Sequence, residues 1–545
     1  MRPELVVVIC VIIIIGVSVL SPKLKIATPL VLVVIGLGIS VLPGVQPVVI
    51  PSEWVLAGVL PPLLYASAIN LPLVDFRKNF GSISVLSVAL VIVSALVTGF
   101  LLFMILPQLN LASAIALGAV ISPTDAVAAT SIGKRLGLPP RLVAVLEGES
   151  LVNDASSLVL LRTAVAAAAG TTAIAGGGGA VIDFAYSSVI GIAVGLAVGA
   201  LTVFLRSKLH DSVVNTAVSF LIPFLAYIPA EALGASGVLA VVVAGLYTGH
   251  MGARYFSAST RISERTNWRT IQFLLENGVF LLMGLELKNI VVAAIEPSGE
   301  TDHLDAVGAV VLGLGAAIVL LVIRFAFVGP LLAVQQARAR RRDPTGAEAS
   351  EATGWRGGAV LSWAGMRGVV TVAAAQSLPD GTPYRNELVL IAFTVSIVTL
   401  LVQGGTLPWI IRVMKLTGVD ERADHEEFAT LVDELRAAGL QVLDAPELTL
   451  PNGDAVDESV VDRVRSDADL RSESAWERAH AADSGGTAPH RQYRVLRLEV
   501  LKAERAALLD ARGRGEYNSR ILVRAQLMLD QEEARLAQSD GSGQH

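Results

Sequence analysis

Charged and aromatic side chains are scarce in this chain of 545 residues: 17% of the residues are charged and 5% are aromatic. Apolar residues make up 53% of the chain, and the mean hydropathy is +0.62. A soluble globular protein carries more charge than this, so the composition excludes a purely soluble protein. The apolar residues are mostly Val, Leu, Ile, Ala and Gly, which suit closely packed membrane helices.

Cysteine is almost absent, because Cys10 is the only one in the sequence. The chain therefore has no internal disulfide, and a metal site built from cysteines is excluded. The basic residues occur in short clusters between apolar runs, which argues against a nucleic-acid partner. The motifs Gly-x-Ser-x-Gly and His-Glu-x-x-His are missing, which argues against serine and zinc hydrolases.

Long apolar runs dominate the sequence up to about residue 414. A helix needs roughly 17–25 residues to cross a hydrocarbon core, and thirteen runs meet this length. They centre on residues 4–20, 26–42, 53–69, 80–105, 111–131, 141–169, 180–205, 211–229, 233–250, 268–290, 304–334, 356–378 and 386–414. We predict an all-α polytopic membrane protein of about 13 transmembrane helices, with Pro229-Ala-Glu231 dividing the eighth run from the ninth.

The loops between the runs differ in charge. No small-x-small cleavage site follows the first run, so we expect it to be retained as a span. One set of alternate loops carries 18 Lys and Arg residues, from Lys23 to Arg356, whereas the other set carries Arg2, Lys288 and Arg385. Because basic loops stay in the cytosol, this asymmetry predicts an outside N-terminus and a cytosolic C-terminus.

The composition changes near residue 418. We assign residues 1–418 to a transmembrane domain and residues 419–545 to an acidic cytosolic tail, which holds 26 of the 48 acidic residues from Asp420 onward. A charged helix is predicted from Asp420 to Gly439, a linker from Ala482 to Pro489, and amphipathic helices from Arg494 to Leu536. The tail either packs on itself or on the transmembrane domain, or has a regulatory role.

The fifth run contains a proline and a carboxylate in the middle of a span, at Ser122-Pro123-Thr124-Asp125. Pro123 has no N–H and leaves a backbone carbonyl free, which predicts a broken helix. Its second half then begins near Thr124 and Asp125 with free N–H groups. The simpler alternative is a proline kink in which Asp125 only caps the second half.

The sixth run carries a polar stripe. At 100° per residue, one face of a helix collects Glu149, Ser150, Asn153, Asp154 and Ser157. Carboxylate, amide and hydroxyl oxygens are the ligands that a small cation needs when it loses its water. The alternative is a polar network that only joins helices, but two carboxylates in a membrane are costly for that purpose.

Two arginines in later spans are candidates to balance these acids. Arg324 interrupts the eleventh run, and Arg367 lies in Gly365-Met366-Arg367-Gly368 of the twelfth. A guanidinium in the bilayer needs a carboxylate or free carbonyls, so we expect one arginine to pair with Glu149 or Asp125. Snorkelling to the surface is the alternative for Arg324. The glycines predict a second interrupted helix, and two such helices indicate inverted repeats around a midplane site.

These motifs carry a resemblance to a known family. Ser122-Pro-Thr-Asp125, Glu147-Gly-Glu-Ser-Leu-Val-Asn-Asp154 and Gly365-Met-Arg-Gly368 closely resemble the monovalent cation:proton antiporter family 1, the NhaP-type and NHE-type sodium/proton exchangers. The resemblance covers about residues 5–415. It implies thirteen spans, crossing broken helices at spans 5 and 12, and a homodimer with a scaffold beside a mobile core. Ala126 departs from the pattern, since many relatives carry a second proline there.

The resemblance also implies roles for individual residues. Asp154 would bind cation or proton alternately, with Ser150, Thr124 and Asp125 around it. Asn153 stands where an electrogenic relative would carry a second aspartate. Glu149 would be bridged to Arg324, and Arg367 would offset the helix dipoles at the crossing. The transported cation would then be held by a set of oxygen ligands, which are Asp154, Ser150 and Thr124.

Taken together, these features predict a secondary transporter rather than an enzyme. We expect Na⁺ to be exchanged for H⁺ by electroneutral alternating access in the cytoplasmic membrane, serving pH and sodium homeostasis. We expect no cofactor, because the cation and the proton are substrates. Three alternatives fit the sequence less well. An intramembrane aspartyl protease would need Gly-x-Gly-Asp, which is missing; a channel needs a pore lined along its length, and a cation/solute symporter needs a larger polar cavity.

Overall fold

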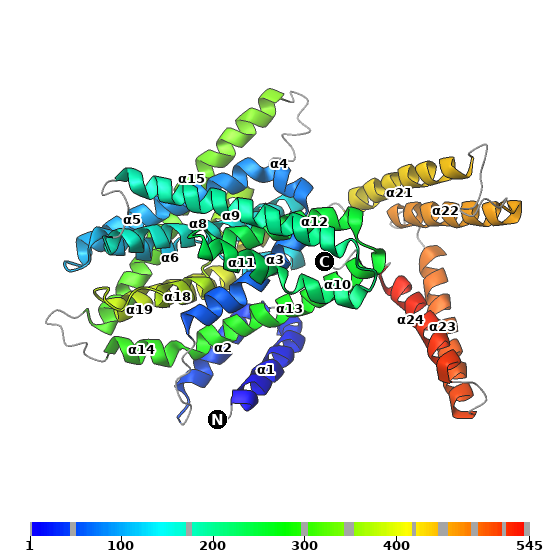
Figure 1. The fold of residues 1–545 in the computed structure, drawn as a ribbon, viewed down its shortest axis with the longest axis horizontal. Helices are drawn as coiled ribbons and strands as arrows, with labels where there is room; N and C mark the ends of the chain where they lie inside the picture. Colours follow the sequence, from blue (N-terminus) through cyan, green and yellow to red (C-terminus); the bar gives the residue numbers. More distant parts are fainter. Residues whose placement is uncertain are drawn as a thin grey trace. The chain divides into compact units, whose positions relative to one another are not determined.

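The structure is a computed structural model and describes residues 3–24, 26–43, 51–170, 177–295, 304–342, 354–416, 421–444, 456–480, 489–514 and 519–538. Every regular element within these ranges is helical, which confirms the predicted fold class (Figure 1). The chain forms two compact units, Met1–Thr417 and Gly418–His545, called here the membrane unit and the tail unit.

The membrane unit is a succession of α-helices with three short π-helical segments. In chain order they are α1 (Pro3–Leu24), α2 (Thr28–Val41), η1 (Trp54–Val59), α3 (Leu60–Asn70), α4 (Leu73–Ser84), η2 (Val85–Ala89), α5 (Leu90–Ile105), α6 (Leu111–Ile121), α7 (Val127–Arg135), α8 (Pro140–Ala168), α9 (Gly177–Arg206), α10 (Ser212–Ser219), α11 (Ile222–Ala232), α12 (Gly237–Tyr255), α13 (Ala258–Leu285), α14 (Leu287–Ile295), α15 (Ala306–Arg342), α17 (Trp355–Trp363), α18 (Val369–Gln376), α19 (Arg385–Val398), η3 (Thr399–Gln403) and α20 (Gly404–Met414).

Seven stretches of the described chain are helical, long and apolar enough to cross a membrane: Leu73–Ile105, Pro140–Ala168, Val181–Arg206, Ser212–Ala232, Ala258–Ile295, Ala306–Val334 and Arg385–Met414. Three shorter apolar helices, Val7–Ser21, Thr28–Val41 and Trp54–Asn70, precede these stretches, and a fourth, Leu111–Ile121, follows the first of them. The fifth and twelfth runs fall short because each is broken into halves of 8 to 11 residues. The count of thirteen spans stays a prediction.

The predicted boundary between the eighth and ninth runs is wrong. Pro229 lies inside α11, which continues to Ala232, and α12 begins only at Gly237. The helix is capped two residues after its end by Gly234, whose φ of 69° is left-handed. There the N–H of Ala235 bonds to Ala230 O and the N–H of Gly234 bonds to Glu231 O, both at 2.9 Å. A glycine C-cap, and not the proline, therefore terminates this helix.

Helix packing divides the membrane unit into two groups. The scaffold group contains α1, α2, η1, α3 and α9 to α13, in which α12 packs on α9 and α3, and α13 packs on α2. The core group contains α4 to α8, η2, α15, α17 to α20 and η3, in which α6 packs on α5 and α8, and α15 packs on α17 and α19. Within the core group a long helix, a broken pair and a second long helix occur twice in the same order, as expected of repeats.

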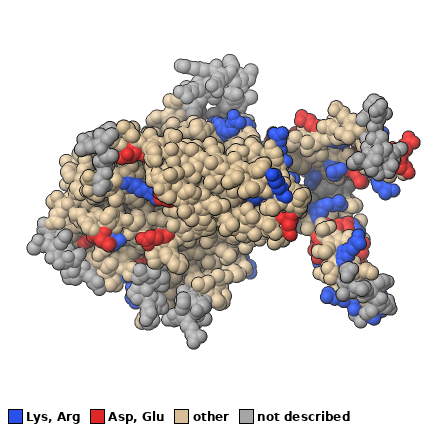
Figure 2. Space-filling view, in the orientation of Figure 1, with Lys and Arg blue, Asp and Glu red and all other residues tan. Residues whose placement is uncertain are grey.

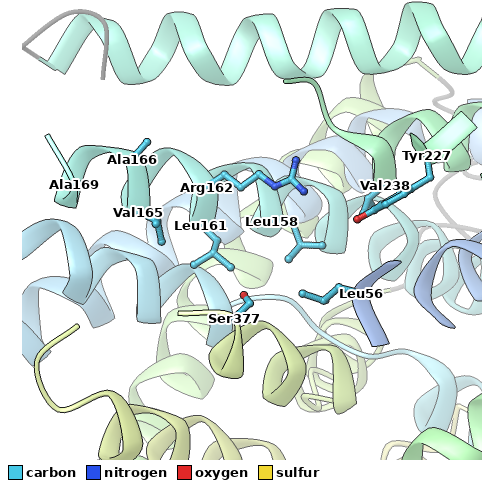
Figure 3. A pocket seen from close by; sticks show the side chains of 10 residues that line it. All are labelled: Leu56, Leu158, Leu161, Arg162, Val165, Ala166, Ala169, Tyr227, Val238 and Ser377. Atoms are coloured by element: carbon cyan, nitrogen blue, oxygen red, sulfur yellow. The ribbon is translucent and has the colours of Figure 1, made fainter. Parts of the chain in front are cut away.

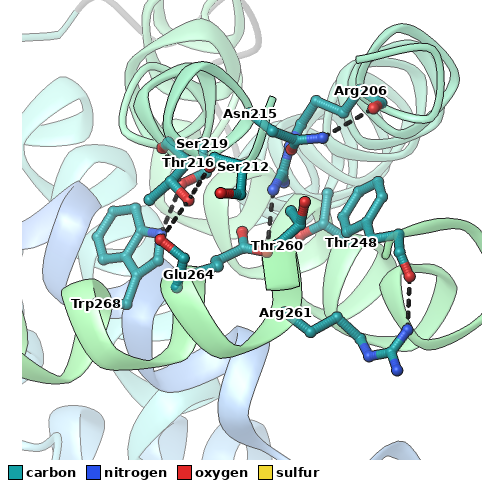
Figure 4. Close-up of polar contacts among 12 residues, drawn as sticks. Arg206, Ser212, Asn215, Thr216, Ser219, Thr248, Thr260, Arg261, Glu264 and Trp268 are labelled. Atoms are coloured by element: carbon teal, nitrogen blue, oxygen red, sulfur yellow. Dashed lines mark hydrogen bonds and ion pairs between the residues drawn. The ribbon is translucent and has the colours of Figure 1, made fainter. Parts of the chain in front are cut away.

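The scaffold group has its own buried polar cluster (Figure 4). Arg206, at the end of α9, is fully buried; its Nε donates to Asn215 Oδ1 at 2.7 Å, and its Nη2 lies 2.9 Å from Glu264 Oε2. Trp268 Nε1 donates to Ser219 Oγ at 3.0 Å. The sequence assigns Arg206 to the basic residues of the cytosolic set of loops. In the structure it is the last residue of α9 and is buried, and it joins α9, α10 and α13.

The tail unit consists of two helical hairpins. They are formed by α21 (Glu421–Leu443) with α22 (Glu458–Ala479), and by α23 (Pro489–Arg514) with α24 (Ser519–Gln538). The first hairpin encloses Ala429, Ala475 and Ala479, and the second encloses Leu501, Leu529 and Leu536. The predicted linker lies outside the described residues except for Pro489, which begins α23.

Charge separates the two units as well. On the visible face of the membrane unit few charged side chains appear, whereas Lys, Arg, Asp and Glu crowd the tail helices (Figure 2). In the tail, Asp433 accepts hydrogen bonds from the Ser472 hydroxyl and, at 2.7 Å, from Trp476 Nε1. These donors hold the pKa of Asp433 below its ordinary value. The tail thus has the ion-paired, water-facing character that its composition predicts.

Candidate cation and proton site

The two broken helices of the core group meet at their breaks. Helix α6 ends at Ile121 and α7 begins at Val127, while α17 ends at Trp363 and α18 begins at Val369. The backbone N–H of Asp125 donates to Met366 O at 2.7 Å, which joins the two non-helical stretches directly. Pro123, which cannot donate a helical hydrogen bond, lies within the first break. The crossing therefore has four helix ends and several backbone groups that bond outside the helical pattern.

Arg367 lies at this crossing and binds the ends of helices. Its side chain is buried, with Nε donating to Ile121 O at 3.1 Å and Nη2 donating to Ser122 O at 3.3 Å. Its Nη1 donates to Gly365 O. These carbonyls follow the C-terminal ends of α6 and α17, where the helix dipole is negative. Among the described residues no carboxylate pairs with Arg367, and its position suits the charge-offsetting role that the resemblance implied.

Asp125 is held at the beginnings of two other half-helices. Its Oδ1 accepts the N–H of Val127 at 2.8 Å, which caps α7. Its Oδ2 lies so close to Gly368, the residue before α18, that a Cβ at that position would overlap the carboxylate. Two helix N-termini, each partly positive, thus face one carboxylate. This geometry also explains why the position must be glycine.

Glu149 forms a buried ion pair with Arg324. The Arg324 Nη1 and Nη2 atoms donate to Glu149 Oε1 and Oε2, the latter at 2.9 Å, and both side chains are almost completely buried. Arg324 Nε and Nη2 also donate to Leu361 O at 3.2 and 3.1 Å. A two-point, fully hydrogen-bonded pair is the form in which a buried ion pair is tolerated. Snorkelling of Arg324 to the surface is excluded.

The other polar residues of the α8 stripe form hydrogen bonds with the non-helical segment between α6 and α7. Asn153 Nδ2 donates to Thr124 O at 3.0 Å and to Thr124 Oγ1 at 2.9 Å, and Thr124 Oγ1 in turn donates to Glu149 Oε1 at 2.9 Å. Ser150 Oγ accepts the N–H of Ala126 at 3.2 Å. Asn153 Oδ1 is buried and, among the described residues, has no hydrogen-bond partner. The stripe therefore does join helices, but the carboxylate of one of its residues is left without a partner among the described residues.

That residue is Asp154. Its backbone carbonyl accepts the hydroxyl of Ser157 at 3.4 Å, but within the described ranges no group donates to its carboxylate or pairs with it. The side chain is half-buried and interacts electrostatically with the Asp125 carboxylate. The predicted ligands Ser150 and Thr124 do not bond to it directly, because their hydroxyls bind Ala126, Glu149 and Asn153 instead.

Two π-helical segments contribute hydroxyl groups to this site, and the sequence analysis missed them. Ser87 of η2 donates from Oγ to Glu149 O at 3.1 Å, and Thr399 of η3 accepts the N–H of Arg367 on Oγ1 at 3.0 Å. The π-turn is common at functional positions. Runs of apolar residues with a single Ser or Thr carry no signal that distinguishes a π-turn from an α-helix.

One carboxylate in the scaffold group was also overlooked. Glu276 lies in the apolar part of α13, accepts Gln272 Nε2 at 2.7 Å, and interacts electrostatically with Asp125, Lys134 and Glu147. It has no ion pair with another described residue. The rule that found Asp154 would have found it too, since a charge inside an apolar run is itself the signal.

The donor set at the crossing suits a small monovalent cation. Carboxylate, hydroxyl and carbonyl oxygens surround the two breaks, as hard cations require. Across the described part of the chain, no cluster of three or more His, Cys, Asp or Glu residues is arranged to hold a resident metal ion. Two broken helices that cross beside an uncommitted carboxylate in a membrane-spanning bundle define an ion transporter rather than an enzyme.

The comparisons with known proteins give the family. The profile described as "Sodium/hydrogen exchanger, transmembrane" matches residues 7–413, and the chain belongs to this family. An uncharacterized Na⁺/H⁺ exchanger of Mycobacterium bovis is 30% identical over 95% of this chain and 93% of its own length. The low-affinity Na⁺/H⁺ antiporter NhaS1 of Synechocystis is 30% identical over 75% of this chain and 73% of its own.

A solved structure supports the fold. The sodium/proton antiporter MjNhaP1 of Methanocaldococcus jannaschii matches with a TM-score of 0.57 and 17% identity, over 77% of this chain and all of that one. At this identity the likeness concerns the fold alone. The resemblance first suggested by three short motifs is therefore confirmed over almost the whole membrane unit.

Proposed function

We propose that the chain exchanges a monovalent cation, Na⁺, for H⁺ across the cytoplasmic membrane by alternating access, with Asp154 as the carboxylate that binds either one. The observation that carries the proposal is the state of the acids at the crossing. Glu149 is ion-paired with Arg324, and Asp125 lies at the N-termini of two half-helices. By contrast, no described residue pairs with the Asp154 carboxylate or donates a hydrogen bond to it. One group is thus free to change partners.

Exchange follows from competition at that group. A proton and a sodium ion cannot both occupy one carboxylate, so each displaces the other. Moving a bare carboxylate through the apolar boundary between the two helix groups is costly, whereas moving a neutralised one is not. The core group therefore changes sides only when Asp154 carries a cation or a proton, and the two flows are coupled. The oxygens of Thr124 and Ser150 complete the cation's coordination once their present hydrogen bonds rearrange.

The proposed stoichiometry is one cation for one proton. Asn153, next to Asp154, is uncharged, and the charges of Glu149 and Arg324 cancel within their ion pair. Only one charge is then carried in each direction. No cofactor takes part in this cycle, since both ligands are substrates.

The surroundings of the protein complete the proposal. The excess of Lys and Arg in alternate loops supports an outside N-terminus and a cytosolic tail in the cytoplasmic membrane. A homodimer is proposed because the core and scaffold groups resemble the arrangement that the family resemblance implies. The tail hairpins give the protein a cytosolic surface through which exchange could be regulated.

The test is cation-driven proton movement in proteoliposomes, with Na⁺, Li⁺ and K⁺ added separately across a range of pH. We expect proton movement with Na⁺, unchanged when the membrane potential is clamped, and a loss of at least tenfold in Asp154→Asn. The matched control is Asp380→Asn, whose side chain is 99% exposed and which should exchange normally. Exchange that survives in Asp154→Asn, or a net current in the parent, would contradict the proposal.

A further inference from the structure

An ion pair joins the two helix groups beyond the cation site. Arg162 lies on α8 of the core group, eight residues or about 12 Å along the helix from Asp154. Its Nη2 lies 2.5 Å from Glu231 Oε2 on α11 of the scaffold group. We call this end of the membrane unit, where α8 ends near Ala168, the distal end.

The scaffold side of this contact is pre-formed. Glu231 Oε1 accepts the N–H of Gly237 at 3.0 Å, so the α11–α12 turn fixes the carboxylate. A Cβ at Gly237 would lie 2.7 Å from Glu231 Oε1 and 2.6 Å from the ring of Tyr227, so only glycine leaves room for both. The core side is flexible by contrast, because Arg162 reaches across on a long side chain that is 50% exposed.

A cavity of about 410 Å³ lies between the two groups beside this pair (Figure 3). From α8 it is lined by Leu158, Leu161, Arg162 and Val165, and from the scaffold group by Leu56, Tyr227 and Val238. Leu158 follows Asp154 by one helical turn. The cavity therefore extends along α8 to the helical turn that follows Asp154, and the Arg162 guanidinium, which pairs with Glu231, lies on its wall.

A second polar contact joins the groups at the same end. Gln376, the last residue of α18, donates from Nε2 to Glu286 Oε2 at 3.3 Å, and Glu286 follows the end of α13. A smaller cavity of about 140 Å³ lies between these helices. The helix that carries Asp154, α8, and one half-helix of the crossing, α18, are thus both attached to the scaffold group at the distal end.

We propose that Arg162 and Glu231 form a gate of the exchange cycle: their pairing closes the path from the distal end to Asp154, and the pair separates in every cycle when the core group moves. This inference rests on the proposed function. Partly exposed ion pairs contribute little to stability, and this pair is partly exposed on both sides. Such a pair can open and close without a large barrier, unlike the buried pair of Glu149 and Arg324.

The gate can be tested by linking its two sides. Because Cys10 is the only cysteine, Cys10→Ser gives a cysteine-free parent, into which Arg162→Cys and Glu231→Cys are introduced together. A bifunctional methanethiosulfonate reagent of matching length then joins the groups in proteoliposomes. We expect linking to reduce the exchange measured in the unlinked double-cysteine protein at least tenfold, and a reductant to restore it.

The matched control links two residues within the scaffold group at the same end. Tyr186 and Leu233 are both exposed, and the Tyr186 hydroxyl donates to Leu233 O at 3.2 Å. Tyr186→Cys with Leu233→Cys should exchange normally after treatment with the same reagent. If linking positions 162 and 231 left exchange unchanged, the gate would be overturned, but the proposed exchange function would not. If the Cys10→Ser parent showed no exchange, the proposed function would be overturned instead.

A second double-cysteine variant keeps the test decisive if the variant with Arg162→Cys and Glu231→Cys shows no exchange even before linking. Gln376→Cys with Glu286→Cys spans the same boundary and leaves Arg162 and Glu231 in place. The proposal requires that linking this pair also stops exchange in a reversible way. Normal exchange with the Gln376 and Glu286 positions linked would show that the distal end does not open, and the gate would be refuted.

Discussion

At the scale of single residues, the site is defined by which acid is left without a partner. The sequence predicted the polar stripe of α8, the two arginines and the importance of Asp154. The residues alone could not decide whether Arg324 pairs with Glu149 or Asp125, because that choice depends on how α15 is placed against α8; the family resemblance implied the Glu149–Arg324 pair, which the structure contains. Nor did the sequence predict that the Thr124 hydroxyl is held between Glu149 and Asn153, or that Glu276 lies in the apolar part of α13 without an ion pair to another described residue.

The Glu149–Arg324 pair leads to a prediction about stability. In Glu149→Gln the buried guanidinium keeps its bonds to Leu361 but loses its counter-charge. Breaking one side of a buried pair costs about 3–5 kcal/mol, so we expect a clearly lower midpoint of thermal unfolding in detergent.

The matched control for this prediction lies on the same helix. Glu147 is two residues away from Glu149 and pairs with the exposed Lys134 at 2.7 Å. Glu147→Gln should change stability by less than about 1 kcal/mol, as exposed pairs do. Equal unfolding midpoints for the two variants would mean that the buried pair does not hold the core group together.

At the scale of elements, the breaks in two helices create the site. Pro123 predicted the first break and the glycines beside Arg367 predicted the second, since both residue types weaken a helix locally. The end of α11 was predicted at Pro229 and lies three residues later, because the left-handed Gly234 supplies the cap. The π-segments η2 and η3 were not predicted, because no residue pattern marks them.

The crossing itself gives a prediction at this scale. A methyl group at Gly368 would overlap the Asp125 carboxylate, so Gly368→Ala must push α7 and α18 apart. Overpacking of this kind costs about 1–3 kcal/mol and displaces the site, and we expect exchange in proteoliposomes to fall at least tenfold.

Gly405 provides the comparison for Gly368. It lies in α20, and a Cβ there would meet no atom within 4 Å. Gly405→Ala should therefore leave exchange and stability close to those of the parent. If Gly368→Ala exchanged as well as Gly405→Ala, the close approach of the two half-helices would not matter for transport.

At the scale of the whole molecule, the sequence predicted more of the fold than of the site. The scarcity of charge, the long apolar runs and the acidic tail predicted a helical membrane protein with a polar C-terminal part. The burial of Arg206 was not predictable from its neighbours in sequence, because its partners Asn215 and Glu264 come from other helices. The division into core and scaffold groups likewise depends on contacts between helices far apart in the chain.

The central claim is that one carboxylate, Asp154, releases its proton when it takes a cation. The most direct measurement is proton release from the purified protein in weakly buffered detergent solution when Na⁺ is added. We predict release of up to one proton per chain in the parent and in Asp380→Asn, and none in Asp154→Asn. Proton release of the same size from Asp154→Asn would contradict the account.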